Sequence, residues 1–162
     1  MYAATLLGLL AGAATSEALK YDVPTSIKAT NCPLPANYTV SDFTIYTDTA
    51  NNTKSATTFS FSDPSTGIET FCSRNSTSKP SATGTNRWPC DNSMVAFIWQ
   101  TTGIAGLTMI EQACPGSVPQ FEASGLIAPE LACTNSTSGS TCVAKQSPIF
   151  GDFDSFEPAP PS

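Results

Sequence analysis

The sequence contains no histidine, and charged residues make up only 12% of its 162 residues. The lack of histidine excludes Ser-His-Asp and Cys-His catalytic machinery, because both need an imidazole as proton acceptor. The chain also has no glycine-rich phosphate loop, so no nucleotide cofactor is expected. With a net charge of −6 and only seven basic residues, neither nucleic acid nor an anionic membrane is an expected partner, since both need a basic face.

Long hydrophobic runs are absent beyond the first 18 residues, so no transmembrane helix is expected there. Residues 6–14 form an apolar run that is too short to span a bilayer, and small residues follow it. This pattern predicts a signal peptide, residues 1–18, cleaved after Ala18. We therefore expect an extracellular protein in which residues 19–146 form one β domain and residues 147–162 form an acidic, Phe- and Pro-rich tail.

Six cysteines follow the expected signal peptide: Cys32, Cys72, Cys90, Cys114, Cys133 and Cys142. An even number in an oxidising compartment predicts three disulfides, although the sequence leaves many pairings open. Proximity along the chain favours Cys72–Cys90 and Cys133–Cys142, which leaves Cys32 with Cys114. Without histidine or a Cys-x-x-Cys motif, neither a zinc site nor any other metal site is expected.

Asparagine-linked glycosylation is predicted by four sequons, which begin at Asn37, Asn51, Asn75 and Asn135. Each falls in a segment typical of a loop or a strand end, where an acceptor asparagine is accessible. The set agrees with a eukaryotic secretory route.

Period-two alternation of apolar and polar residues dominates the chain and predicts an all-β fold. The expected strands are residues 40–49, 57–62, 67–72, 93–100 and 104–112, with weaker candidates at 118–123, 130–134 and 141–145. Short strands separated by Gly, Pro and Asn turns indicate a single disulfide-stapled β-barrel or β-sandwich. Residues 147–162 differ in composition, and we expect a disordered C-terminal tail. The alternative is that its three phenylalanines dock on the domain or on a partner.

A recognisable order of segments runs from Thr70-Phe-Cys72 through a polar loop to Trp88-Pro-Cys90, then to Val95-Ala-Phe97 and Gly106-Leu-Thr-Met109. In this order the chain resembles the fungal Alternaria-major-allergen-like (AA1-like) family over residues 42–142. The resemblance implies a small secreted β-barrel with few or no catalytic features, in a family that includes elicitors of plant defence. It places the protein in the plant apoplast or the fungal cell wall.

The same resemblance implies two of the disulfides, Cys72–Cys90 and Cys133–Cys142. In the allergen an early lone cysteine links two subunits, so a homodimer is one expectation for this chain. A bridge between Cys32 and Cys114 would make Cys32 internal and argue against that dimer.

A candidate binding surface lies in the loop between Cys72 and Cys90, which carries Arg74, Lys79, Arg87 and Trp88. A basic loop on an acidic protein favours an acidic host extracellular protein or a pectin-like cell-wall polysaccharide as partner. The alternative is that the bases only solubilise the loop and that Trp88 packs on the adjacent disulfide.

We expect a secreted fungal effector or elicitor that acts by protein binding and modulates plant defence, not an enzyme. A structural cell-wall protein is one alternative. A small glycan-directed hydrolase is another, because such an enzyme needs only a pair of carboxylates. Its candidate residues are Asp42, Asp48, Asp63, Glu69, Asp91, Glu111 and Glu122. Glu111 and Glu122 would have to converge in one pocket.

Overall fold

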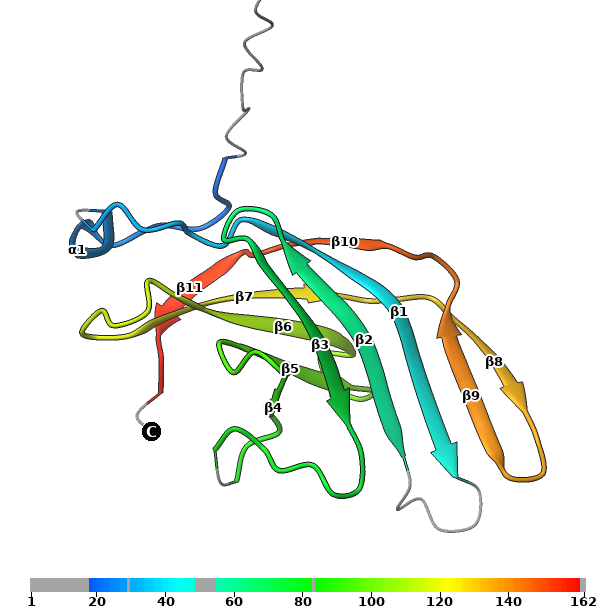
Figure 1. Ribbon diagram of the computed structural model, residues 1–162. Helices are drawn as coiled ribbons and strands as arrows, with labels where there is room; N and C mark the ends of the chain where they lie inside the picture. Colours follow the sequence, from blue (N-terminus) through cyan, green and yellow to red (C-terminus); the bar gives the residue numbers. More distant parts are fainter. Residues whose placement is uncertain (1–17, 29, 49–54, 83, 161–162) are drawn as a thin grey trace, which may run out of the picture.

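The computed structural model describes residues 18–28, 30–48, 55–82 and 84–160. The described residues form one short helix and eleven strands (Figure 1), namely α1 (Thr25–Lys28), β1 (Asn37–Asp48), β2 (Ala56–Asp63), β3 (Ile68–Arg74), β4 (Trp88–Pro89), β5 (Val95–Gln100), β6 (Gly106–Ala113), β7 (Phe121–Ile127), β8 (Leu131–Asn135), β9 (Gly139–Ala144), β10 (Ile149–Asp152) and β11 (Ser155–Pro158). None of the described helices is long and apolar enough to cross a membrane.

Two antiparallel sheets face each other. Sheet A has the order β3-β2-β1-β9-β8, with β10 also paired to β1, and sheet B has the order β11-β7-β6-β5-β4. The all-β prediction is confirmed, and the architecture is the sandwich rather than a closed barrel in the part of the chain described. On one side the sheets are joined by the chain itself, which leaves β10 in sheet A and enters β11 in sheet B (Figure 1).

The core between the sheets is rich in aromatic side chains. Phe59 meets Phe97 edge to face, with ring centroids 4.9 Å apart, and Phe43 packs on Trp99 at 5.0 Å. Each pair joins one sheet to the other, since Phe59 and Phe43 belong to sheet A and their partners to β5. Aromatic pairs in these geometries add stabilisation beyond the burial of area alone.

Strand β1 keeps its apolar residues inward despite an irregular spacing. Val40 and Phe43 are both buried although they are three residues apart, which a regular strand would place on opposite faces. The register with β2 shifts between Ser41 and Thr44, and Asp42 adopts a positive φ of 57°. This β-bulge inserts one residue and restores the inward direction.

Three disulfides join Cys32 to Cys114, Cys72 to Cys90, and Cys133 to Cys142, with Cα–Cα distances of 5.6, 4.2 and 4.0 Å. These are the pairs that proximity in sequence favours. The first ties the N-terminal segment to the chain just after β6, and the last links two strands of one hairpin. Because Cys32 is bonded within the chain, it is not free to link a second subunit.

The expected disordered tail is wrong for residues 149–158, which form β10 and β11. Phe153 is fully buried and donates its N–H to the carbonyl of Ala36. Phe156 stacks between Tyr21 and Phe121, with centroid distances of 4.9 and 5.2 Å. The alternative prediction, docking of the phenylalanines on the domain, is correct for Phe153 and Phe156. Burial of their apolar rings stabilises the folded segment although its composition is acidic.

Candidate binding surface

The loop predicted to bind a partner begins in β3 and returns at β4, and a disulfide closes it. Cys72 and Cys90 are both buried in the main core, so both ends of the loop are anchored in the interior. Backbone hydrogen bonds from Asp91 to Phe71 and from Ser81 to Arg87 further fix the returning strand. The loop is therefore held at its base by covalent and hydrogen bonds.

Trp88 belongs to this base rather than to the exposed tip. It is half-buried and packs against the core, and the guanidinium carbon of Arg74 lies 4.4 Å from the centroid of its ring. A cation at this distance from an indole face is stabilised by the ring quadrupole. The structure thus brings Arg74 and Trp88 together, and it supports the packing alternative for Trp88.

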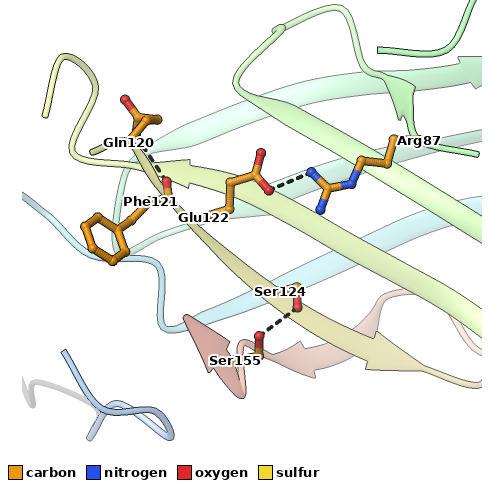
Figure 2. Close-up of polar contacts among 6 residues, drawn as sticks. All are labelled: Arg87, Gln120, Phe121, Glu122, Ser124 and Ser155. Carbon is orange, nitrogen blue, oxygen red and sulfur yellow. Dashed lines mark hydrogen bonds and ion pairs between the residues drawn. The ribbon is translucent and has the colours of Figure 1, made fainter. Parts of the chain in front are cut away.

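Arg87 reaches across the outer face of sheet B to Glu122 in β7 (Figure 2). Its Nη1 donates to Oε2 of Glu122 at 2.6 Å, and the two side chains are 28% and 15% exposed. Ile110 of β6, which lies beside this ion pair, is only 4% exposed. The charge of Arg87 is therefore balanced by Glu122 within the protein. Among the basic residues predicted to bind a partner, Lys79 is exposed and has no ion pair in the described part of the chain.

A shallow pocket of about 250 Å³ lies beside this ion pair, and its lining comes from β6, β7, β11 and the residue before β4. It is lined by Arg87, Ile110, Glu122, Ser124, Ser155, Glu157, Pro158 and Pro160. The hydroxyl of Ser124 donates to that of Ser155 at 3.2 Å, which joins the β7 and β11 walls (Figure 2). One guanidinium, two carboxylates and two hydroxyls on an apolar floor suit a polar ligand or a protein side chain.

Gln120, which directly precedes β7, fixes the start of that strand. Its side-chain amide donates to the carbonyl of Ala113 at 2.6 Å and to the carbonyl of Phe121 at 3.1 Å, and Figure 2 shows the second of these bonds. Phe121 in turn packs on Phe156 of β11. The strand that carries Glu122 is therefore held by both neighbours.

Comparison with solved structures places this geometry in a known fold. Two crystal structures of the Alternaria alternata major allergen Alt a 1 match with TM-scores of 0.52 and 0.53, each at 14% identity. The matches cover 78% and 75% of this chain and 96% and 93% of the allergen chains. The chain has the Alt a 1 fold. No family model and no curated protein sequence matches it.

Within the Alt a 1 fold, Glu111 and Glu122 do not converge in one pocket, as a hydrolase that uses this pair would require. Glu111 lies opposite Ala123 in the sheet, whereas Glu122 lies opposite Gln112. Cross-strand partners share a face and neighbours along a strand alternate, so the two glutamates lie on opposite faces of sheet B. Glu111 points into the core and is fully buried, while Glu122 belongs to the outer pocket.

The carboxylates that the structure does bring together are Glu111 and Asp63, and sequence reasoning missed this pair. Both are fully buried, and burial, the largest cause, raises the pKa of each, that of Glu111 to about 8. The charge of Asp63 adds to the rise at Glu111, and the nearby Thr66 lessens it. Asp63 Oδ1 accepts hydrogen bonds from the N–H groups of Ser65 and Thr66, which oppose the rise in its own pKa.

This buried carboxyl cluster, Asp63, Thr66 and Glu111, carries four polar atoms without a hydrogen-bond partner in the described structure. They are Asp63 Oδ2, Thr66 Oγ1 and both carboxyl oxygens of Glu111. Although Thr66 is near enough to lessen the pKa shift of Glu111, its hydroxyl is not within hydrogen-bond geometry. A buried carboxyl group without hydrogen-bond partners is more stable in its protonated form, so Glu111 retains its proton up to about pH 8.

The remaining predicted carboxylates do not gather. Among the described residues, no group of three or more Cys, Asp or Glu side chains is placed to hold a metal ion. Asp42 lies on the β1 bulge, Asp48 ends β1, Glu69 is exposed on sheet A, and Asp91 follows β4.

The predicted glycosylation sites lie in different settings. Asn75 is exposed, and its side-chain oxygen accepts hydrogen bonds from the backbone N–H and the hydroxyl of Thr77, at 2.9 and 2.8 Å. Asn135 is exposed at the end of β8, and Asn37 is half-buried at the start of β1. Asn51 lies outside the described residues.

Proposed function

We propose that this chain is a secreted extracellular protein of the effector or elicitor type, which acts by binding another protein. Three disulfides in an Alt a 1-like fold fit an oxidising extracellular compartment. The predicted signal peptide and sequons favour the same location. The Alt a 1 structures are described as those of an allergen, and a non-enzymatic role for this chain agrees with that description.

The observation that carries the proposal is the anchoring of the loop between Cys72 and Cys90. The buried disulfide holds its base, and the Arg87–Glu122 ion pair fastens its returning end to sheet B. Lys79 and Asn75, which lie between these two anchors in the sequence, are exposed. A loop fixed in this way loses little conformational entropy on binding, which favours recognition of a partner.

The positive charge of the loop favours an acidic surface on a host extracellular protein as the partner. Lys79 has no ion-pair partner among the described residues, and the guanidinium group of Arg74 rests on the ring of Trp88. Because the rest of the protein is acidic, with a net charge of −6, a positive loop orients the approach of such a partner.

Charge reversal in the loop tests this proposal. We expect Lys79→Glu and Arg74→Glu to abolish the specific capture of a protein from plant apoplastic fluid and to change the defence response of infiltrated leaves. Lys145→Glu is the matched control, because Lys145 is an exposed base that pairs with Glu130 far from the loop in sequence. Arg87 is left unchanged, since its ion pair is part of the scaffold. Equal capture by the loop variants and the control would contradict the proposal.

A glycan-directed hydrolase is a weaker candidate. The carboxylates that lie close together, Asp63 and Glu111, are fully buried and have no access to a polymer. Glu122 is engaged by Arg87, and its neighbour Glu157 lines a pocket that is shallow. Release of reducing ends from cell-wall glycans that depends on Glu122 or Glu157 would favour this function instead.

A further inference from the structure

The outer face of sheet A carries hydroxyl groups bounded at opposite ends by exposed phenylalanines. Two neighbouring cross-strand rows run over β10, β1, β2 and β3. They are Phe150–Thr39–Ser62–Glu69 and Ser41–Ser60–Phe71. Residues opposite each other in a sheet share a face, so the members of both rows point the same way. Phe61 and Val40, which alternate with them, point into the core.

The hydroxyls of these rows are available to a ligand. Within the described chain, the side chains of Thr39, Ser41, Ser60 and Ser62 have no hydrogen-bond partner in the protein. The same four residues line a hollow of about 250 Å³, together with Phe61, Glu69 and Thr70. No described helix or strand packs on this face, whose strands contact only their sheet neighbours and the edge and inner side of sheet B.

The electrostatics of the hollow select an uncharged ligand. Its lining includes no basic residue and a single carboxylate, Glu69, which is exposed. A polyanion would be repelled there and would find no cation to pair with. An apolar partner would strip water from four hydroxyls without replacing their hydrogen bonds, at a cost in free energy for each. A neutral molecule rich in hydroxyl groups avoids the charge repulsion and replaces the hydrogen bonds that the four hydroxyls lose to water.

The two phenylalanines indicate that this molecule is extended. Phe71 is 46% exposed and Phe150 is 71% exposed, although large aromatic residues are usually buried. They lie three interstrand spacings apart, or roughly 15 Å including their offset along the strands. Each ring offers an electron-rich face to the C–H groups of a sugar ring, as it does to other positively polarised edges. A ligand that contacts both rings spans several sugar units.

We propose that the outer face of sheet A binds a neutral, extended polysaccharide, with Phe71 and Phe150 stacking on sugar rings and the hydroxyls between them bonding to sugar hydroxyls. Glu69 accepts further hydrogen bonds at one end. This site is on a different sheet from the Arg87–Glu122 pocket and is independent of the protein-binding proposal. Binding at this site would hold the protein on a cell-wall polymer while the loop between Cys72 and Cys90 stays accessible.

The test is the fraction of disulfide-bonded protein that sediments with insoluble chitin, cellulose or a β-1,3-glucan. We expect the unmodified protein to bind at least one of these, and Phe71→Ala and Phe150→Ala each to weaken that binding ~5-fold or more. Leu126→Ala is the matched control, because Leu126 is 41% exposed on sheet B and its loss should leave binding unchanged. Circular dichroism of each variant verifies that it is folded.

Three results would overturn the proposal. The first is no binding to any neutral polymer, and the second is equal binding by the phenylalanine variants. The third is equal or stronger binding to polygalacturonate, which would point to a charged ligand. A concentration-dependent dimer that is lost in Phe71→Ala, without glycan binding, would assign the face to a second copy. Asn37→Gln removes a glycan that would stand next to Thr39, and this variant is expected to bind at least as well.

Discussion

A Glu111→Gln variant is expected to remove most of the dependence of folding stability on pH between pH 4.5 and 8. Glu111 is fully buried, and neither of its carboxyl oxygens has a hydrogen-bond partner in the described structure. Its pKa rises from 4.5 to about 8, because burial disfavours the ionised form and the neighbouring Asp63 adds repulsion. The unfolded chain loses this proton near pH 4.5, whereas the folded protein holds it up to about pH 8.

The sign and size of the effect follow from proton linkage. Above pH 4.5 the folded state binds more protons than the unfolded state, so the free energy of unfolding falls as the pH rises and levels off near pH 8. A shift from 4.5 to about 8, at about 1.4 kcal/mol per unit, corresponds to a loss of about 5 kcal/mol. The raised pKa of Asp63 acts in the same direction. This loss is comparable with the whole stability of a small domain.

The assay is urea denaturation at pH 4.5, 6 and 8 with the disulfides intact, followed by the fluorescence of Trp88 and Trp99. Glutamine keeps the size of the side chain and cannot ionise, so the variant should match the unmodified protein at pH 4.5 and exceed it at pH 8. Glu122→Gln is the control, because Glu122 lies on the outer face and pairs with Arg87. Stability of the unmodified protein that is constant or rises from pH 4.5 to 8 would refute the reasoning. So would an equal flattening of the profile by Glu122→Gln.

Further predictions concern the ion pair, the disulfides and the C-terminal segment. A double-mutant cycle of Arg87→Ala and Glu122→Ala, read by urea denaturation, should give a coupling energy of about 1–2 kcal/mol, and a value near zero would show that the pair does not fasten the loop. Loss of the Cys32–Cys114 disulfide, which spans 82 residues, should lower the free energy of unfolding by ~4.5 kcal/mol, against ~2.5 kcal/mol for the 9-residue span of Cys133–Cys142. The reverse order in thermal melts would contradict the loop-entropy argument. Phe153→Ala should cost about 3–5 kcal/mol and expose the C-terminal strands to protease, whereas unchanged proteolysis would mean that this residue does not anchor them.

The all-β architecture could be predicted because alternation along the strands is regular. In β2, Phe59 and Phe61 face the core and Ser60 and Ser62 face outward, as period two requires. The spacing of the cysteines also favours the disulfide pairs that the structure contains, because short loops close most readily. Local signals were sufficient in both cases.

The C-terminal strands were not predictable in the same way. Phe150, Phe153 and Phe156 recur every third residue, which is not the period of a strand, because the chain leaves sheet A after β10 and enters sheet B before β11. A change of sheet resets the alternation. The acidic and proline-rich composition then predicted disorder, while the buried contacts that hold Phe153 and Phe156 are all distant in sequence.

The buried carboxyl cluster shows a conflict that sequence alone does not resolve. Met109, Glu111 and Ala113 alternate on one face of β6, and alternation therefore places Glu111 inside, whereas its charge predicts a solvated position. Because β6 lies between β5 and β7, its alternation is fixed and Glu111 points into the core. The pKa of its carboxyl group is raised there, so the group retains its proton. Its partner Asp63 ends β2 in the opposite sheet, so no spacing along the chain connects the two.

The two outer faces of the sandwich differ in what they are able to recognise, and this difference makes the two proposals separable. Sheet B presents an ion pair beside an anchored loop, and sheet A presents uncharged hydroxyls between exposed phenylalanines. Salt weakens attraction between exposed charges but has little effect on hydroxyl and stacking contacts. Raising the salt concentration should therefore release a protein partner bound through Lys79 while leaving glycan-bound protein in place. Release of both together would mean that one charged surface accounts for both interactions.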